Sequence, residues 1–353
     1  MKNRNRVSLF NILSTCLLYG ISFFTAPLFS RLLGTDGYGA VANYTVWVSV
    51  LSVSATLLTY GTLAPAMVEY PEEAQKKYQS SVMTLSLCTF FAVTVLISLF
   101  LGPISRGLRL SPFFIFLILF QSIGTFGINF MNTKLTYEMQ AGKNLILSVG
   151  TSLATLVLSL VLVLLLPQGL KHYGRIVGIA LVYGVLGLIM CLSVLRRGRT
   201  FYAPGYWKFC VPLAIPLVFY NLADLLLGHS DVIMLRQLLD QSTSGVYNYG
   251  YQLGTILFTL FNALNNSWVA FFYADFKQGK TQDVQRQSRN FLELFTVLSA
   301  GFLLLCREVY MLYARQDFWA ATSLVPLFAA SHYLTFLGTF PANYEYYHKK
   351  MKM

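Results

Sequence analysis

Residues 144–166 read NLILSVGTSLATLVLSLVLVLLL, a run of 23 residues without one charged side chain. An α-helix rises about 1.5 Å per residue, so about 20 apolar residues are enough to cross the ~30 Å hydrocarbon core of a bilayer. The length and composition of this stretch therefore predict a transmembrane helix.

Similar apolar stretches recur along the whole chain, which a single signal peptide cannot explain. Of the 353 residues, 56% are hydrophobic and only 11% are charged, against roughly 25% charged in a soluble domain. The connections are too short for a folded extramembrane domain. The sequence thus predicts an all-α integral membrane protein and excludes a secreted globular enzyme. The ten predicted spans are 7–30, 39–63, 81–102, 112–131, 144–166, 175–195, 209–228, 245–272, 290–313 and 318–340.

The basic residues outnumber the acidic ones by 26 to 14, which gives a net charge of +12. A nucleic-acid-binding protein can carry such a charge, but in a chain this apolar we expect the basic residues to set the membrane topology, with no nucleic-acid partner. With the N-terminus inside, 18 basic residues fall in cytoplasmic segments and 8 on the opposite side. The positive-inside rule therefore predicts a multi-pass protein of the cytoplasmic membrane with both termini in the cytoplasm.

An internal repeat is visible at an offset of 205 residues. The segment RLLGTDGYGAVANY (31–44) aligns without gaps with RQLLDQSTSGVYNY (236–249), and five of the fourteen positions are identical. Both copies follow an odd-numbered span and lie six spans apart, so the repeat is predicted to be parallel, about a pseudo-twofold axis along the membrane normal. It divides the chain into a six-helix lobe, 1–205, and a four-helix lobe, 206–353.

By the same offset, a second lobe of equal length would end near residue 410, estimated from the length of one parallel repeat. We therefore expect the C-terminal lobe to be incomplete and the chain to be a truncated transporter. A partner chain that supplies the missing helices, or a transporter for which ten spans suffice, are the alternatives.

Two groups of residues carry a resemblance to a known family. They are 11–27, RLLG at 31–34 and Tyr38-Gly39 in the first group, and Ser230-Asp231, Gly245-Val-Tyr247, Asn265–Trp268 and Phe272-Tyr273 in the second. These residues resemble Wzx-type oligosaccharide flippases of the multidrug/oligosaccharidyl-lipid/polysaccharide superfamily. Val232 and Ala270 depart from the family pattern, in which a basic residue and a proline are common at these positions.

This resemblance implies two six-helix lobes around a central cavity. It also implies export of undecaprenyl-pyrophosphate-linked oligosaccharide from the cytoplasmic to the outer leaflet. The implied partners are the lipid-linked oligosaccharide, membrane lipids and other polysaccharide assembly proteins.

Three cationic residues are candidates for binding the pyrophosphate of such a substrate. Arg31 and Arg236 occupy equivalent positions of the repeat, which places one on each lobe, and a guanidinium group binds phosphate oxygens in a bidentate manner. Lys134, at the inner end of the fourth span, is placed to receive the headgroup on the cytoplasmic side. The alternatives are that the arginines extend to lipid headgroups and that Lys134 anchors the topology.

Asp224 is the one carboxylate well inside a predicted span, and Asn221 lies on the same helical face. Pro216 removes the hydrogen bond to the carbonyl of residue 212 and is expected to kink the helix. A freed carbonyl near Asn221 and Asp224 suggests a coupling site for Na⁺ or H⁺. The alternative is a hydrogen-bonded structural carboxyl group.

Asn43 and Asn248, a further repeat-related pair, are also candidates for binding the substrate, although we expect them to cap or bridge helices at the cavity wall rather than to touch it. The histidines and cysteines show no metal-ligand spacing, so no metal or cofactor is expected. A cation-coupled multidrug antiporter of the same fold is the alternative function, although it should carry a carboxylate in the first lobe and the first predicted span has none. A membrane-embedded polymerase or acyltransferase fits less well, because the sequence has neither a large external loop nor an intramembrane His/Asp group.

Overall fold

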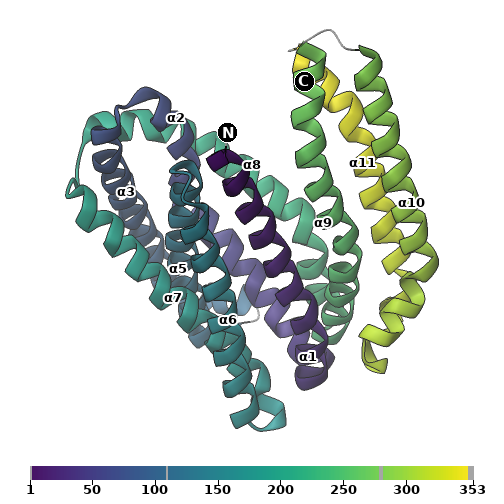
Figure 1. The fold of residues 1–353 in the computed structure, drawn as a ribbon. Coiled ribbons are helices and arrows are strands. Elements are labelled where there is room, and N and C mark those ends of the chain that lie inside the picture. The colour runs from purple at the N-terminus through teal and green to yellow at the C-terminus, as the bar shows by residue number, and fades with distance from the viewer. Residues whose placement is uncertain (1, 109, 278–280, 349–353) are drawn as a thin grey trace. The chain divides into compact units, whose positions relative to one another are not determined.

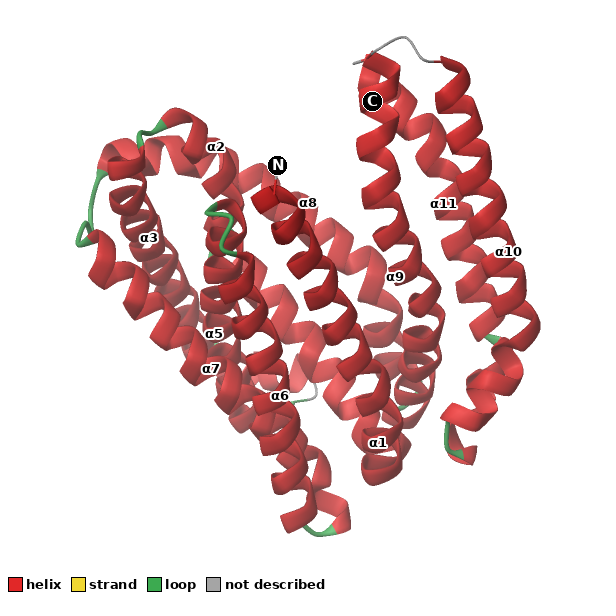
Figure 2. Ribbon diagram, viewed as in Figure 1, coloured by secondary structure: helices red, strands yellow, loops and turns green. Residues whose placement is uncertain are grey.

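The computed structural model describes residues 2–108, 110–277 and 281–348, and within these ranges it consists of helices joined by short loops, with no strand (Figures 1 and 2). The predicted all-α fold is confirmed. By its internal contacts the chain divides into two compact units, Met1–Gln241 (unit 1) and Ser242–Met353 (unit 2).

Unit 1 contains most of the helices. They are α1 (Lys2–Ser54), η1 (Thr59–Thr62), α2 (Leu63–Glu69), α3 (Glu72–Leu99), α4 (Leu101–Leu108), α5 (Pro112–Tyr137), α6 (Ala141–Leu165), η2 (Gln168–Leu170), α7 (Lys171–Gly198) and α8 (Pro204–Leu238). Helix α9 (Gln241–Lys277) begins at the last residue of unit 1 and belongs otherwise to unit 2, with α10 (Thr281–Tyr313), η3 (Gln316–Ser323) and α11 (Val325–His348).

In the described part of the chain, six helices are long and apolar enough to cross a membrane, and two bent helix pairs bring the number to eight. Each of the ten predicted stretches lies largely on helix. The bent pairs are Gly20–Ser54 with Thr59–Glu69 and Gln316–Ser323 with Val325–Glu345. The predicted stretches 39–63 and 318–340 are therefore broken rather than continuous helices.

The first predicted span and residues 39–54 of the second belong to α1, which is interrupted at Gly34. Its backbone angles, φ 67° and ψ −177°, lie in a region that is essentially restricted to glycine. Leu239 stands 205 residues later (34 + 205 = 239). It is the C-cap residue directly after α8, with φ −112° and ψ −105°. The helix breaks thus fall at the same position of the sequence repeat.

The second break follows α1, where Leu57 and Leu58 adopt the left-handed conformation with φ of 55° and 47°. Leucine rarely adopts this conformation, so the surrounding contacts must hold it. The Ser86 hydroxyl donates to the carbonyl of Thr56 at 2.8 Å and lies 2.7 Å from the Thr59 hydroxyl, and all three side chains are fully buried. These hydroxyl groups form hydrogen bonds with the backbone and side chains of the turn. The apolar pattern of the sequence alone cannot indicate such contacts.

Helix α7 packs against α5 through glycines. A Cβ atom on Gly187 would lie 2.0 Å from the carbonyl oxygen of Gly124, and one on Gly127 would lie 2.3 Å from that of Gly187. Another face of α7 meets α6 in the same way, because a Cβ atom on Gly178 would lie 2.6 Å from the hydroxyl oxygen of Ser159. Small residues allow such close approach of helices in membranes, so α7 is the helix around which α5 and α6 pack.

Unit 2 is held by aromatic rings. Phe261, Phe295 and Phe336 are almost fully buried. Their ring centroids lie 5.7 Å apart for Phe261 and Phe295, and 4.4 Å apart for Phe295 and Phe336. Trp268 stacks on Phe291 at 5.3 Å in the same cluster.

Helix α8 stays helical through Pro212 and Pro216 and packs against α1 and α3 within unit 1. The sequence repeat assigns α8 to the lobe 206–353, whereas the contacts place it in unit 1. The lobes are defined by the sequence repeat and the units by internal contacts. The two boundaries can differ, because a duplicated segment can pack most closely against the other copy. The lobe boundary at 205/206 stays a prediction.

Candidate functional site

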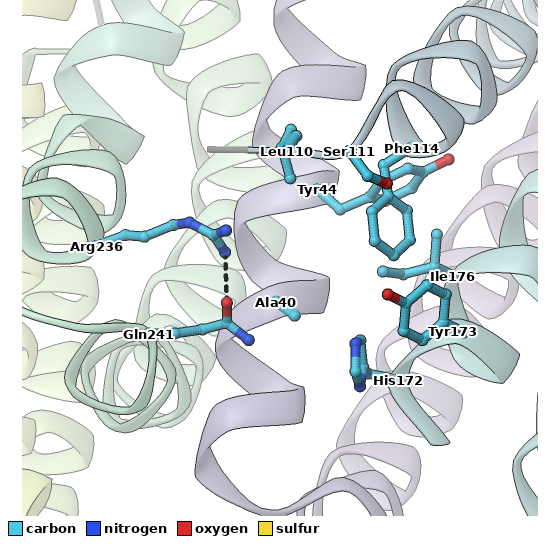
Figure 3. A pocket seen from close by; sticks show the side chains of 10 residues that line it. All are labelled: Ala40, Tyr44, Leu110, Ser111, Phe114, His172, Tyr173, Ile176, Arg236 and Gln241. Atoms are coloured by element: carbon cyan, nitrogen blue, oxygen red, sulfur yellow. Dashed lines mark hydrogen bonds between the residues drawn. The ribbon is translucent and has the colours of Figure 1, made fainter. Parts of the chain in front are cut away.

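A cavity of about 230 Å³ lies at one end of unit 1 (Figure 3). The residues that line it come from helix ends far apart in the sequence. They are Ala40 and Tyr44 of α1, Leu110, Ser111 and Phe114 at the start of α5, His172, Tyr173 and Ile176 of α7, Arg236 of α8 and Gln241 of α9. Among the predicted site residues, Arg236 is the one that lines this cavity.

Arg236 is held in place by its neighbour Gln241. The Arg236 guanidinium donates a hydrogen bond to the Gln241 side-chain oxygen at 2.9 Å, drawn as a dashed line in Figure 3. The Gln241 amide nitrogen in turn donates to the backbone oxygen of Asp36 at 2.7 Å. Asp36 and Gln241 are 205 residues apart and thus equivalent in the repeat. The hydrogen bond thus joins two equivalent positions of the sequence repeat, both within unit 1.

The opposite wall of the cavity is aromatic. The ring of Phe114 stacks on Tyr173 with centroids 4.8 Å apart, and the His172 ring lies 4.5 Å from that of Tyr173. Tyr44 is fixed from outside the cavity, since its hydroxyl donates to the Gln121 side-chain oxygen at 2.8 Å. His172 and Tyr173 are half-buried, so their rings remain accessible from the cavity side. Neither residue could be predicted as part of a site from the sequence, because neither lies near a recognisable motif.

Arg31, the repeat equivalent of Arg236, does not line the cavity. Its side chain is exposed, and within the described residues it forms no hydrogen bond or ion pair. It comes three residues before the break at Gly34, which separates it from Ala40 and Tyr44. The structure therefore does not bring Arg31 and Arg236 together in one pocket, and the binding role predicted for Arg31 stays a prediction.

Arg175 is an additional cation, which stands at the first residue of the predicted span 175–195 and was not a candidate site residue. The helix α7 begins at Lys171, so Arg175 lies one turn inside it. Its guanidinium carbon is 3.8 Å from the centroid of the Phe29 ring, a cation–π contact. Its Nη1 atom is buried and has no hydrogen-bond partner among the described residues. The helix begins four residues before the predicted span, so Arg175 lies inside the helix rather than at its first residue.

Lys134 lies at the other end of α5 from the cavity. It is only 4% exposed, and its ammonium nitrogen is 3.8 Å from a carboxylate oxygen of Glu138. The charges of Arg197 and Lys76 also act on Lys134. Three cationic groups thus gather near one carboxylate, which leaves a net positive charge at this end of the helix.

Asn221 and Asp224, the predicted coupling site for Na⁺ or H⁺, form no hydrogen bond with one another in the described structure. The Asn221 amide donates to the backbone oxygen of Leu217 at 2.8 Å. Asp224 is exposed and forms no hydrogen bond or ion pair among the described residues, although its charge acts on the His229 imidazole. A cation site at Asn221 and Asp224 stays a prediction.

The asparagines of the repeat are both buried. Asn43 is 1% exposed, and its amide nitrogen has no hydrogen-bond partner in the described part of the chain. Asn248, in unit 2, accepts a hydrogen bond from Gln252 on the same helix at 3.2 Å. The hydrogen bond between Asn248 and Gln252 lies within one helix, and bridging between helices stays a prediction for both asparagines.

The fold is similar to that of MATE transporters of known structure. The chain is similar to a multidrug resistance MATE family transporter of the MOP superfamily in its inward-facing conformation, with 12% identity and a TM-score of 0.60 over 96% of this chain and 80% of that one. It is also similar to MATE in complex with MaL6, with 12% identity and a TM-score of 0.62 over 96% and 81% of the two chains. At such low identity these likenesses describe the fold alone.

The family follows from the sequence. The family model of polysaccharide biosynthesis proteins matches residues 6–271, so the chain belongs to the polysaccharide biosynthesis protein family. No curated protein matches it. The resemblance to Wzx-type flippases is confirmed at the level of the family, and family and fold are those of membrane flippases and transporters rather than of enzymes.

Proposed function

We propose that this protein moves undecaprenyl-pyrophosphate-linked oligosaccharide across the cytoplasmic membrane for surface polysaccharide biosynthesis. The match of residues 6–271 to the polysaccharide biosynthesis family carries the proposal. The substrate joins an anionic headgroup to a polar sugar chain and a long apolar tail. A membrane protein that transports it therefore needs cationic groups near both membrane surfaces.

The two ends of α5 meet this requirement. Phe114 lines the cavity with Arg236, and Lys134 lies 20 residues further along the same helix (134 − 114 = 20). At about 1.5 Å per residue these positions are roughly 30 Å apart, which is the thickness of the hydrocarbon core. In this proposal Lys134 receives the pyrophosphate at the cytoplasmic surface, and Arg236 lies at the outer surface. The buried position of Lys134 beside Glu138 supports a ligand role over a simple anchoring role.

Complementation of a strain that lacks its oligosaccharide exporter tests the proposal. Expression of this chain should restore surface polysaccharide, which is the outcome if ten spans suffice and not the outcome if the chain is a truncated transporter. Lys134→Met and Arg236→Gln should reduce the restored polysaccharide at least tenfold. Lys143→Met is the matched control, because Lys143 is an exposed lysine close to the same helix end. Arg31→Ala tests the remaining cation. Normal expression without any polysaccharide at the surface would contradict the proposal.

The orientation can be tested with single cysteines. A membrane-impermeant maleimide should label Ser111→Cys in intact cells, since Ser111 is exposed beside the cavity. It should label Lys143→Cys only after the membrane is permeabilised. The reverse pattern contradicts the assignment of both termini to the cytoplasm.

The multidrug resistance transporters that share this fold support a second candidate, cation-coupled antiport of small molecules. Asp224, as an exposed carboxylate within a span, is the residue that favours it. Efflux of a cationic dye that depends on Na⁺ or on pH and is lost in Asp224→Asn would support the antiporter. In the flippase proposal the same variant weakens the ion dependence of polysaccharide export instead.

A further inference from the structure

The groups around the cavity of unit 1 combine three kinds of recognition. Arg236 offers a planar cationic fork, Gln241 offers an amide, and Ser111 offers an exposed hydroxyl. Figure 3 shows Arg236 and Gln241 on one side of Ala40, and His172 and Tyr173 on the other. The polar groups thus face the aromatic side chains across Ala40, a small residue. Such an arrangement is typical of a binding site for a polar ligand with an apolar face.

The size of the cavity limits the ligand. Its volume of about 230 Å³ equals that of about eight water molecules at ~30 Å³ each. One sugar ring with a charged substituent is of this order, whereas a disaccharide is too large. A bare phosphate ion would leave most of the volume empty and would not use the aromatic wall.

The aromatic wall is ready to receive a ring. Tyr173 is backed by Phe114, stacked at 4.8 Å with an interplanar angle of 27°, and flanked by His172. These contacts hold the Tyr173 ring in one orientation, so little side-chain freedom is lost when a ligand packs against it. The C–H face of a sugar packs well on an aromatic ring, and its hydroxyl groups need donors and acceptors such as those of Gln241.

Arg236 adds a preference for charge. Its guanidinium is oriented by the hydrogen bond to Gln241, and Gln241 is anchored on the backbone of Asp36. A guanidinium held in this way binds a carboxylate or a phosphate oxygen pair with defined geometry.

We propose that this cavity binds a single sugar residue that carries an oxyanion, with the ring on Tyr173 and the oxyanion on Arg236. The inference rests on the proposed function and names the part of the oligosaccharide that unit 1 selects. The oxyanion is either the carboxylate of an acidic sugar or the phosphate attached to the first sugar. Because the cavity is about one bilayer thickness from Lys134 along α5, it selects the sugar near the surface opposite to the one where Lys134 lies.

Ligand binding to the purified full chain in nanodiscs tests this without transport, by saturation-transfer NMR and competition. The probes are glucuronate, glucose 1-phosphate, glucose and inorganic phosphate. Glucuronate, glucose 1-phosphate or both should bind at least about tenfold more tightly than glucose or inorganic phosphate, since a hydrogen bond to a charged group contributes that much. Preference for one of the two names the source of the oxyanion.

Variants assign the two contacts. Arg236→Gln should reduce the affinity for the charged sugars to that for glucose, and Arg236→Lys should recover only part of it. Tyr173→Leu should weaken all sugars about fivefold or more and leave any phosphate binding unchanged. Lys143→Met should bind like the wild type, and unchanged thermal unfolding confirms that each variant is folded.

Three results would overturn the inference. They are equal binding of inorganic phosphate and glucose 1-phosphate, equal binding of glucose and glucuronate, and absence of binding to folded protein. Each can occur in a chain that exports polysaccharide normally, and in that case the proposed function stands. Conversely, normal sugar binding by a chain that fails in the exporter-deficient strain contradicts the proposed function alone.

Discussion

Units 1 and 2 both consist of long apolar helices, but different side chains hold these helices together. In unit 1, glycines on α5 and α7 bring backbone against backbone, so that a Cβ atom at Gly187 would lie 2.0 Å from the carbonyl oxygen of Gly124. In unit 2, buried rings fill the space between α9, α10 and α11, with Phe295 and Phe336 only 4.4 Å apart.

This difference in packing predicts which substitutions each unit tolerates. Lipid tails are as apolar as leucine, so helices in a membrane gain stability from close packing rather than from leaving water. A backbone contact cannot be relieved by rotating a side chain, whereas a ring cluster can shift over several residues. Unit 1 should therefore be sensitive to added atoms, and unit 2 to removed ones.

The largest effect is expected for Gly187→Ala in unit 1. The added methyl group meets backbone on α5, so the two helices must separate, and we expect a loss of more than about 3 kcal/mol in the free energy of unfolding. Titration of the purified protein with SDS measures this. Gly150→Ala on α6 is the control, because no atom lies within 4 Å of its Cβ position. Equal stability of the two variants would remove the basis of the comparison.

Phe336→Ala should have the next largest effect, through unit 2. The side chain is fully buried among Phe261, Phe291 and Phe295, and its removal leaves a cavity. We expect the free energy of unfolding to fall by about 2–3 kcal/mol. This is less than the ~3–5 kcal/mol of soluble cores, because the phenylalanine side chain of the wild type stays in an apolar lipid environment when the helices separate. Leu337→Ala, at a neighbouring residue that is 37% exposed, should lose much less. Similar losses in SDS titration would show that the aromatic cluster is not what holds unit 2.

Gly254→Ala tests whether unit 2 also resists added atoms. Its Cβ position lies 2.5 Å from the Cβ atom of Phe328, a side-chain atom rather than a backbone carbonyl. The contact is relieved by a small movement of α11, at an expected cost of about 1–2 kcal/mol. Gly338→Ala on α11 is the control, with no atom within 4 Å. A loss as large as that of Gly187→Ala would mean that the two units pack in the same way.

The helices of both units could be predicted from the sequence because apolar length alone decides membrane insertion. Residues 144–166 illustrate this, since α6 covers Ala141–Leu165. The break at Leu57 and Leu58 could not be predicted, because it depends on Ser86 from another helix. No local pattern requires two left-handed leucines.

The candidate site could be predicted only where a single residue carries the signal. Arg236 was found from its charge and its place in the repeat, and it lines the cavity. His172 and Tyr173 become part of a site only because α7 brings them beside the start of α5, which sequence spacing does not indicate. Arg175 was predicted at the first residue of its span, 175–195, whereas it lies one turn inside α7, which begins at Lys171.

The smallest effect on stability is expected for Gly34→Ala. This variant tests the cost of the backbone conformation without a change in side-chain packing. No atom lies within 4 Å of the Cβ position of Gly34, so the methyl group itself meets nothing. The cost arises from the backbone angles, φ 67° and ψ −177°, and should be about 1 kcal/mol, at the low end for such strain.

The effect of Gly34→Ala on function should exceed its effect on stability, because Gly34 sets the direction of the part of α1 that carries Ala40 and Tyr44 into the cavity. We therefore expect the affinity for a charged sugar to fall about fivefold or more while SDS titration changes little. Gly20→Ala, on the same helix and with no atom within 4 Å, should alter neither property. A variant of Gly34 that binds like the wild type would show that the cavity does not depend on this turn, and the special role of glycine in unit 1 would then be confined to the contacts of α7.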